Sequence, residues 1–164
     1  MGLLSADHMP RGVVALTTGL DDTPYISESE TMVYQLPFTA APKRIYKVTL
    51  RVGRADTNGT GDQAGDVNRY GKNSLVTRCR WASGSTVTTS GAGVGDYRVT
   101  VFDDDSTSAT GVCATWFIVN PPAGQTAVGI AIYAGRTAAT YGQVRYIADG
   151  GAVLVVEDVG PYSE

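Results

Sequence analysis

The chain has few of the residues on which most enzymatic chemistry depends. Its 164 residues include one histidine, His8, and two cysteines, Cys79 and Cys113. Hydrolytic, redox and zinc-dependent sites are usually built around histidine or cysteine clusters, and His8 has no sequence neighbour suited to a triad or a metal site. We therefore expect a scaffold or binding module and not an enzyme, with no catalytic residues, no metal site and no cofactor.

Long apolar runs and an excess of positive charge are also lacking. The formal net charge is −3 and there is no basic stripe, which argues against binding nucleic acid through its phosphates. The longest apolar runs, such as residues 153–156, are far shorter than the ~20 residues that span a bilayer. The N-terminus lacks the basic and apolar regions of a signal peptide. We expect a soluble protein that binds neither nucleic acid nor a membrane.

The chain does contain a series of short alternating segments. In residues 44–53, every second side chain is apolar, which is the period of a strand with one face on a core. Residues 112–119 are apolar on both faces and predict a central strand, or one whose outer face meets something else. The other segments with strand character are 12–17, 31–38, 75–81, 96–102, 128–134, 141–147 and 152–157.

These segments predict an all-β fold. No window has the spacing of an amphipathic helix, and 20 glycines interrupt the chain. Eight or nine short strands without intervening helices are typical of an antiparallel β-sandwich. A jelly roll is the arrangement we expect, and an immunoglobulin-like sandwich is the alternative.

Both cysteines lie in alternating segments. Cys79 shares a predicted face with Leu75 and Trp81, and Cys113 shares one with Thr115 and Phe117. We predict two buried thiols that act as small hydrophobes; a disulfide between them remains open if their strands are neighbours.

Two acidic segments could hold a cation. Residues 56–62 begin like a calcium loop, but the twelfth position from Asp56 is Val67, where such a loop needs a glutamate. Residues 103–106 follow a strand and contain three consecutive aspartates, which are also common in turns. We interpret both as solvated loops. The first belongs to a long Gly-rich loop, residues 53–73, whose length is typical of functional or disordered loops.

Aromatic residues offer an alternative function, because their rings can stack on sugars. Three of them have core-facing positions: Tyr46, Trp81 and Tyr97. Three tyrosines do not: Tyr70, Tyr141 and Tyr162. A carbohydrate- or receptor-binding module therefore remains an alternative.

The first 30 residues fit a packed domain least well, because Pro10 and Gly12 interrupt a stretch of apolar residues. We predict an extended N-terminal arm over residues 1–30 and a sandwich domain over residues 31–164. Terminal arms of this kind either fray or dock on a partner. The expected partner-binding residues are Leu3, Leu4, Met9, Pro10 and Val13.

Two terminal motifs resemble a known family. Residues 9–15 (MPRGVVA) and 152–161 (AVLVVEDVGP) are similar to small β-rich minor tail and virion proteins of tailed phages that infect actinobacteria. The resemblance implies a structural virion subunit made in the host cytoplasm, either a minor tail or accessory surface protein or, alternatively, a head decoration protein that stabilises the capsid. The implied partners are other virion proteins, from the tail or the major capsid protein, and further copies of the chain, in a trimer by analogy with similar decorations.

Overall fold

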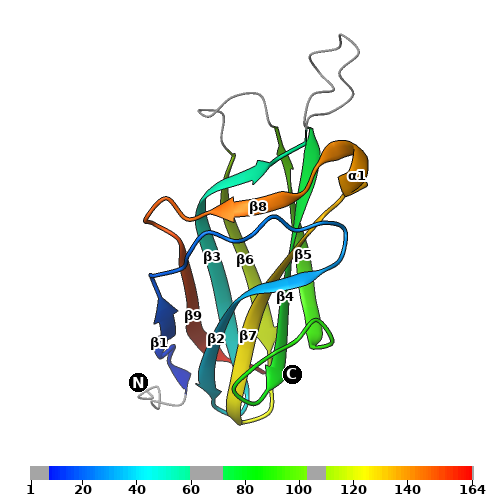
Figure 1. Cartoon of the computed structure of the whole chain (residues 1–164). Helices are drawn as coiled ribbons and strands as arrows, with labels where there is room; N and C mark the ends of the chain where they lie inside the picture. Colours follow the sequence, from blue (N-terminus) through cyan, green and yellow to red (C-terminus); the bar gives the residue numbers. More distant parts are fainter. Residues whose placement is uncertain (1–7, 60–71, 103–109, 164) are drawn as a thin grey trace.

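The computed structural model describes residues 8–59, 72–102 and 110–163 of the chain (Figure 1). Within these ranges nearly all regular structure is β. The elements are β1 (Gly12–Thr17), β2 (Thr31–Ala40), β3 (Arg44–Thr57), β4 (Asn73–Ser83), β5 (Ala92–Val101), β6 (Thr110–Val119), β7 (Gly124–Ala134), the short helix α1 (Ala138–Tyr141), β8 (Val144–Ile147) and β9 (Val153–Pro161).

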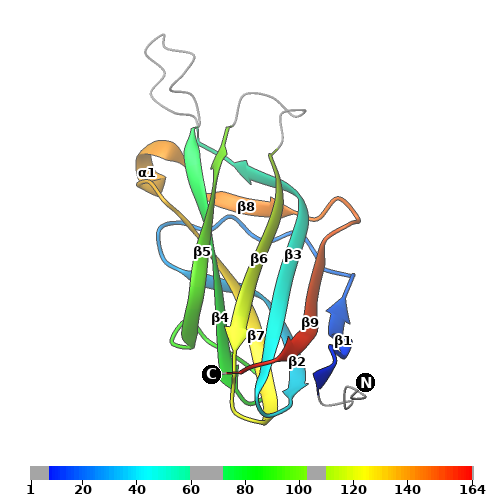
Figure 2. The same cartoon turned by 180° about the vertical axis from the view of Figure 1, so that it is seen from behind.

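The strands form two antiparallel sheets that face each other (Figures 1 and 2). Sheet A has the order β1-β9-β3-β6, and β8 pairs with the C-terminal end of β3. Sheet B has the order β2-β7-β4-β5. The protein is therefore an antiparallel β-sandwich, and the prediction of an all-β sandwich is confirmed.

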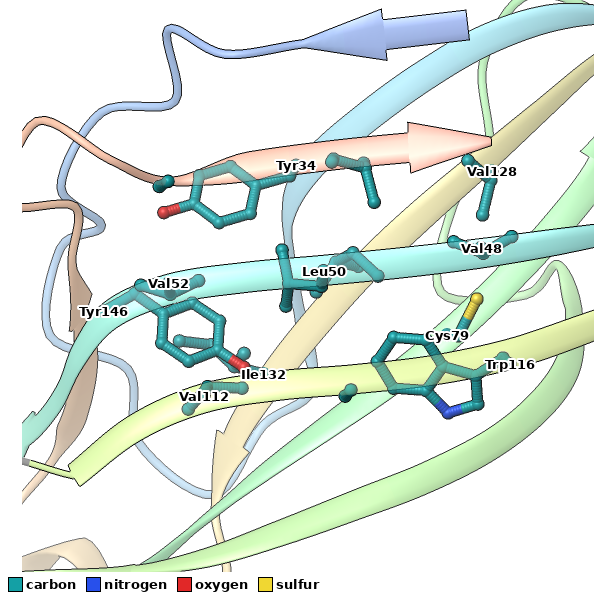
Figure 3. Close-up of a cluster of buried hydrophobic side chains, with 14 of the residues drawn as sticks. Tyr34, Val48, Leu50, Val52, Cys79, Val112, Trp116, Val128, Ile132 and Tyr146 are labelled. Carbon is teal, nitrogen blue, oxygen red and sulfur yellow. The ribbon is translucent and has the colours of Figure 1, made fainter. Parts of the chain in front are cut away.

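The core consists of alternate side chains from the two sheets (Figure 3). Leu50 on β3 and Ile132 on β7 are fully buried, as the alternation predicts. At one end of the core the ring of Tyr146 stacks on that of Tyr34, with ring centroids 6.1 Å apart. The Tyr146 hydroxyl forms a buried hydrogen bond with the Thr77 hydroxyl. This pairing satisfies a polar group that burial would otherwise make costly.

Two strand predictions need correction. Residues 112–119 belong to β6, which is the last strand in the order of sheet A and not a central one. Its inner residues are buried, but Phe117 and Val119 are 52% and 51% exposed. The segment 141–147 is a strand only from Val144 onward, because the helical turn α1 ends at Tyr141 and Gly142 follows with a positive φ of 83°.

Residues 8–30, the described part of the predicted arm, do not form a separate extended segment. Residues 12–17 form β1, an edge strand that pairs with β9. Farther along, the Ile26 amide donates to the Val144 carbonyl at 2.8 Å, and the Thr23 amide donates to the Tyr146 carbonyl at 3.0 Å. Backbone groups in this stretch thus find partners in the sandwich, so the boundary at residues 30 and 31 does not separate an arm from a domain. Residues 1–7 lie outside the described residues.

A buried ion pair fixes the start of β3 against the end of β9. The side chains of Arg44 and Asp158 are 3% and 1% exposed. Arg44 Nε lies 3.0 and 2.9 Å from the two Asp158 carboxylate oxygens, and Nη2 lies 2.7 Å from Oδ1. Arg44 Nη2 also donates to the Met9 carbonyl, and the Gly160 amide donates to Asp158 Oδ1. One pair therefore connects β3, β9 and the residues before β1.

Replacing Asp158 by Asn should destabilise the fold by about 3 to 5 kcal/mol, because it leaves the Arg44 charge buried without its counter-ion. Equilibrium denaturation measures this loss. The matched control is Arg54→Gln, which breaks the Arg54–Asp149 pair at the surface and should lower the stability much less, because water screens an exposed ion pair. Equal losses in the two variants would contradict this account of the Arg44–Asp158 pair.

The two cysteines differ in exposure. Cys79 is buried between the sheets, as predicted, whereas Cys113 is exposed on the outer side of β6. The prediction of a buried thiol is wrong for Cys113, because the inner positions of β6 are the even-numbered ones from Val112 to Ile118. Both thiols are free, so no disulfide joins them.

A thiol reagent at neutral pH should label Cys113 quickly and Cys79 only when the protein unfolds. Burial raises the pKa of Cys79 to about 12, so almost no reactive thiolate forms there. Absorbance should report one fast thiol per folded chain and two in denaturant. Cys113→Ser should remove the fast reaction, and a fast reaction that survives this change would refute the assignment.

Candidate functional site: the outer face of sheet A

The strand register of sheet A arranges its outward side chains in rows. In one row the neighbours across the strands are Val13, Glu157, Lys47 and Phe117. In the next row they are Leu16, Val155, Thr49 and Thr115. We call the side of the sheet that carries these two rows, with Arg51, Cys113, Val119 and Val153, the outer A face. Figure 2 shows its four strands, β6, β3, β9 and β1, side by side.

Apolar residues lie on the two edge strands of the outer A face. On β1, Val13 and Leu16 are 57% and 54% exposed. On β6, Phe117 and Val119 are exposed to a similar extent. Single exposed apolar residues are normal, whereas several on one face of a sheet make that face a candidate for an interaction surface.

The polar residues between these edges neutralise one another. Lys47 Nζ lies 2.5 Å from Glu157 Oε2, and the Thr49 and Thr115 hydroxyls are 3.4 Å apart. The remaining charge is Arg51, for which the described residues show no carboxylate partner within ion-pair distance. The Lys47–Glu157 pair is therefore neutral as a unit, which lowers the cost of removing it from water, while Arg51 leaves one positive charge on the face.

The outer side of sheet B is different, because it has a network of charged side chains. Glu30 accepts hydrogen bonds from Arg78 and Arg80. The distance from Arg80 Nε to Glu30 Oε1 is 2.5 Å. Asp96 accepts two more from Arg78, at 2.6 and 2.8 Å. The Arg78 guanidinium also lies 5.4 Å from the centre of the Tyr133 ring. These contacts join β4, β5, β7 and the residue before β2, and they occupy this surface with paired charges.

The predicted partner-binding residues are only partly brought together. Val13 lies on the outer A face, and Met9 and Pro10 are exposed just before β1. Leu3 and Leu4 lie outside the described residues. Leu16, Phe117 and Val119 were not among the expected partner-binding residues, although the pattern of residues 112–119 predicted an outer face that meets something else as one of two alternatives. The two-sided apolar pattern of residues 112–119 was the signal that could have identified the last two.

The acidic segments show no cation site in the described part of the chain. Asp56 lies on β3, where its Oδ2 accepts hydrogen bonds from Arg145 Nε at 3.0 Å and the Tyr25 hydroxyl at 3.2 Å. Among the described residues no group of three or more His, Cys, Asp or Glu side chains could hold a metal ion. Residues 60–62 and 103–106 lie outside that part.

Of the tyrosines considered for sugar binding, Tyr141 has a clear position. The Tyr141 ring is covered by the Arg136 guanidinium, 4.8 Å from its centre, so this face of the ring is not open to a sugar. Tyr97 is 37% exposed and not in the core, which corrects its prediction, because β5 is an edge strand of sheet B. Tyr46 is buried as predicted. Tyr70 lies outside the described residues.

A hollow of about 340 Å³ lies between residues 19–24 and β2. Its two acidic residues already have structural contacts. The Asp22 carboxylate accepts a hydrogen bond from the Ala148 amide at 2.7 Å, and the Asp21 carbonyl accepts one from the Tyr34 hydroxyl at 2.8 Å. These contacts hold the segment in place beside β8 and β2.

The described residues form a β-sandwich with exposed apolar side chains at both edges of the outer A face. The chain belongs to the family described as Domain of unknown function (DUF7298), whose match covers residues 3–164. A comparison with curated proteins finds no match. No helix in the described ranges has the length and apolar character needed to cross a membrane.

The network on sheet B predicts an acid-sensitive contribution to stability. Hydrogen bonds from Arg80, and then from Arg78, lower the pKa of Glu30 below 4.5 against the opposing effect of desolvation, and Arg78 likewise lowers the pKa of Asp96 below 3.8. A carboxylate whose pKa is lower in the folded state stabilises the fold above its unfolded pKa and loses that contribution as pH falls through the folded pKa.

Glu30→Gln should therefore lower the free energy of unfolding by about 1 to 2 kcal/mol at pH 7, because two arginines lose their carboxylate partner. Its deficit relative to the unmodified protein should shrink as the pH falls below 4.5 and through the lowered pKa of Glu30 in the folded state, where Glu30 itself becomes protonated. Urea denaturation at pH 7, 5 and 3 measures both values. A deficit that stays constant over this range would contradict the role of the Glu30 charge.

Proposed function

We propose that the chain is a structural, non-enzymatic subunit of a tailed-phage virion, as a minor tail or accessory surface protein. The observation that carries the proposal is the outer A face, an apolar surface with neutralised charges on a rigid sandwich. A subunit that assembles with other proteins needs such a surface, whereas an isolated monomer gains nothing from exposing it. The likeness of residues 9–15 and 152–161 to phage virion proteins supports the same function.

The strand order supports a jelly roll as the finer description of the fold. With β8 set aside as a short insertion, eight strands form two four-stranded sheets, β1-β9-β3-β6 and β2-β7-β4-β5. Successive strands from β1 to β4 alternate between the two sheets, as they do when two Greek keys wrap around one core. Jelly rolls occur in viral capsid proteins, so this order favours a head decoration protein as the second candidate.

The N-terminal residues extend the assembly surface in this proposal. Met9 and Pro10 are exposed before β1, and Val13 lies on the outer A face. Leu3 and Leu4 add two apolar side chains close by in sequence. Their partners would be tail proteins or the major capsid protein, together with other copies of the chain. Repeated attachment in a particle makes weak single contacts sufficient.

In purified virions, the chain should be present in a fixed ratio to the major structural proteins, and labelled antibodies should locate it on the tail. Labelling of the head instead would select the decoration alternative. Replacing both Leu3 and Leu4 by Asp should reduce incorporation by about tenfold or more, because charges cannot be buried without a partner.

The matched control for incorporation is Phe102→Asp. It introduces an aspartate, with one negative charge in place of two, at an exposed residue after β5 that belongs neither to the outer A face nor to the N-terminal residues. This variant should be incorporated normally. If particles lack the unmodified chain, the proposed function is wrong.

A further inference from the structure

The first row of the outer A face is complementary to its own reverse, because its two charges have opposite signs and both of its ends are apolar. Apolar side chains of Val13 and Phe117 lie at the two ends of one row, and an acidic and a basic residue lie between them. Such a row can pair with a reversed copy of itself, because each end then meets an apolar residue and each charge meets the opposite charge. We propose that the outer A face binds the same face of a second copy of this chain, about a twofold axis.

The register defines where this axis lies. An axis that runs along the strands between β9 and β3 places β1 over the partner's β6, and β9 over the partner's β3. Rotation about such an axis keeps each row at its own level along the strands. This is an isologous contact, in which each residue pair occurs twice. Face-to-face packing of two sheets with nearly aligned strands is common in β-sandwich interiors.

Charge complementarity is the main argument for a second copy. At the level of the first row, Lys47 faces the partner's Glu157, and Glu157 faces the partner's Lys47. The internal Lys47–Glu157 pair, at 2.5 Å, would thus become part of a ring of four alternating charges. Neighbouring charges of opposite sign offset much of the cost of removing each one from water.

The apolar and hydroxyl residues agree with the same arrangement. Val13 on β1 would meet the partner's Phe117, and Leu16 would meet the methyl group of the partner's Thr115. Near the axis, Val155 would meet the partner's Thr49. Arg51 would lie opposite the partner's Val153, where its aliphatic stem can pack while the guanidinium reaches water. No like charges face each other in these pairs.

The overall charge of the chain opposes association weakly, so the contact itself must supply the attraction. Each copy has a net charge of −3. Four strands about 4.8 Å apart and nine residues of about 3.3 Å give a face of roughly 19 by 30 Å. Two such faces would bury on the order of 1,100 Å², near the lower limit for specific interfaces. The dimer should therefore dissociate on dilution.

This inference names the partner of the proposed assembly surface and rests on that role of the outer A face. The test uses purified full-length chain, so it does not depend on incorporation into virions. Sedimentation equilibrium over a series of concentrations should give a mass that rises from one chain to two. If the chain dimerises but is absent from particles, only the proposed function fails; if it is incorporated but stays monomeric, only this inference fails.

Charge exchange tests the pairing directly. Lys47→Glu should weaken dimerisation by about tenfold or more, because the new carboxylate would face the partner's Glu157, and Glu157→Lys should do the same. The double variant K47E/E157K restores opposite charges within each chain and across the axis, and should dimerise like the unmodified protein. Circular dichroism and denaturation of every variant confirm that each monomer is folded.

Apolar variants test the edges of the face. Phe117→Asp should give folded monomers, and Phe102→Asp should leave the dimer intact. The inference is overturned if the unmodified chain remains monomeric at every concentration, or if the double charge exchange fails to restore association. A trimer, even one that Phe117→Asp dissociates, would also overturn it, because three copies cannot share one twofold contact.

Discussion

The buried pair of Arg44 and Asp158 is the interaction on which sheet A depends. Arg44 is the first residue of β3, and Asp158 lies on β9 near the end of the chain. Their contact fixes the register of these two central strands close to the bulge between Ile45 and Tyr46. The same guanidinium binds the Met9 carbonyl and thereby positions the entry to β1. Burying two charges together is costly unless their hydrogen bonds are satisfied. Here the Met9 carbonyl and the Gly160 amide add hydrogen bonds to those between the two side chains. The alignment of outward side chains across β1, β9 and β3 follows from this arrangement.

The two outer faces of the sandwich use their side chains in different ways. On sheet B, Glu30 and Asp96 pair with Arg78 and Arg80, and these charges remain hydrated while they connect three strands and a turn. On sheet A, the charges of Lys47 and Glu157 neutralise each other and apolar residues occupy both edges. A protein that functions alone would be expected to place polar residues on both faces. The difference between the faces is the physical basis for interpreting this chain as a component of an assembly.

Several polar side chains in the described part of the chain have structural contacts. Asp56, Asp22 and Tyr34 all bind groups of the fold itself. Burial raises the pKa of Tyr34 to about 12, and the pKa of Tyr146 is also raised, so both hydroxyls stay protonated at neutral pH and serve as hydrogen-bond partners in the core. These polar groups hold the segment of residues 19–26 and β8 against the sandwich. What remains available for partners is the outer A face and the exposed residues that precede β1.

The sequence by itself determined the fold class and most strand positions, because alternation with a period of two depends only on local order. It placed Tyr46, Leu50 and Cys79 in the core correctly. It could not determine which strands are neighbours, since pairing joins residues as distant as Gly12 and Asp158. For that reason the exposure of Cys113 was missed, the position of β6 in its sheet was left open, and the strand predicted at residues 12–17 was assigned to an arm and not to a sheet of the sandwich. The rows of the outer A face exist only after β1, β9, β3 and β6 are brought side by side, and tertiary structure alone decided that Lys47 lies between Glu157 and Phe117.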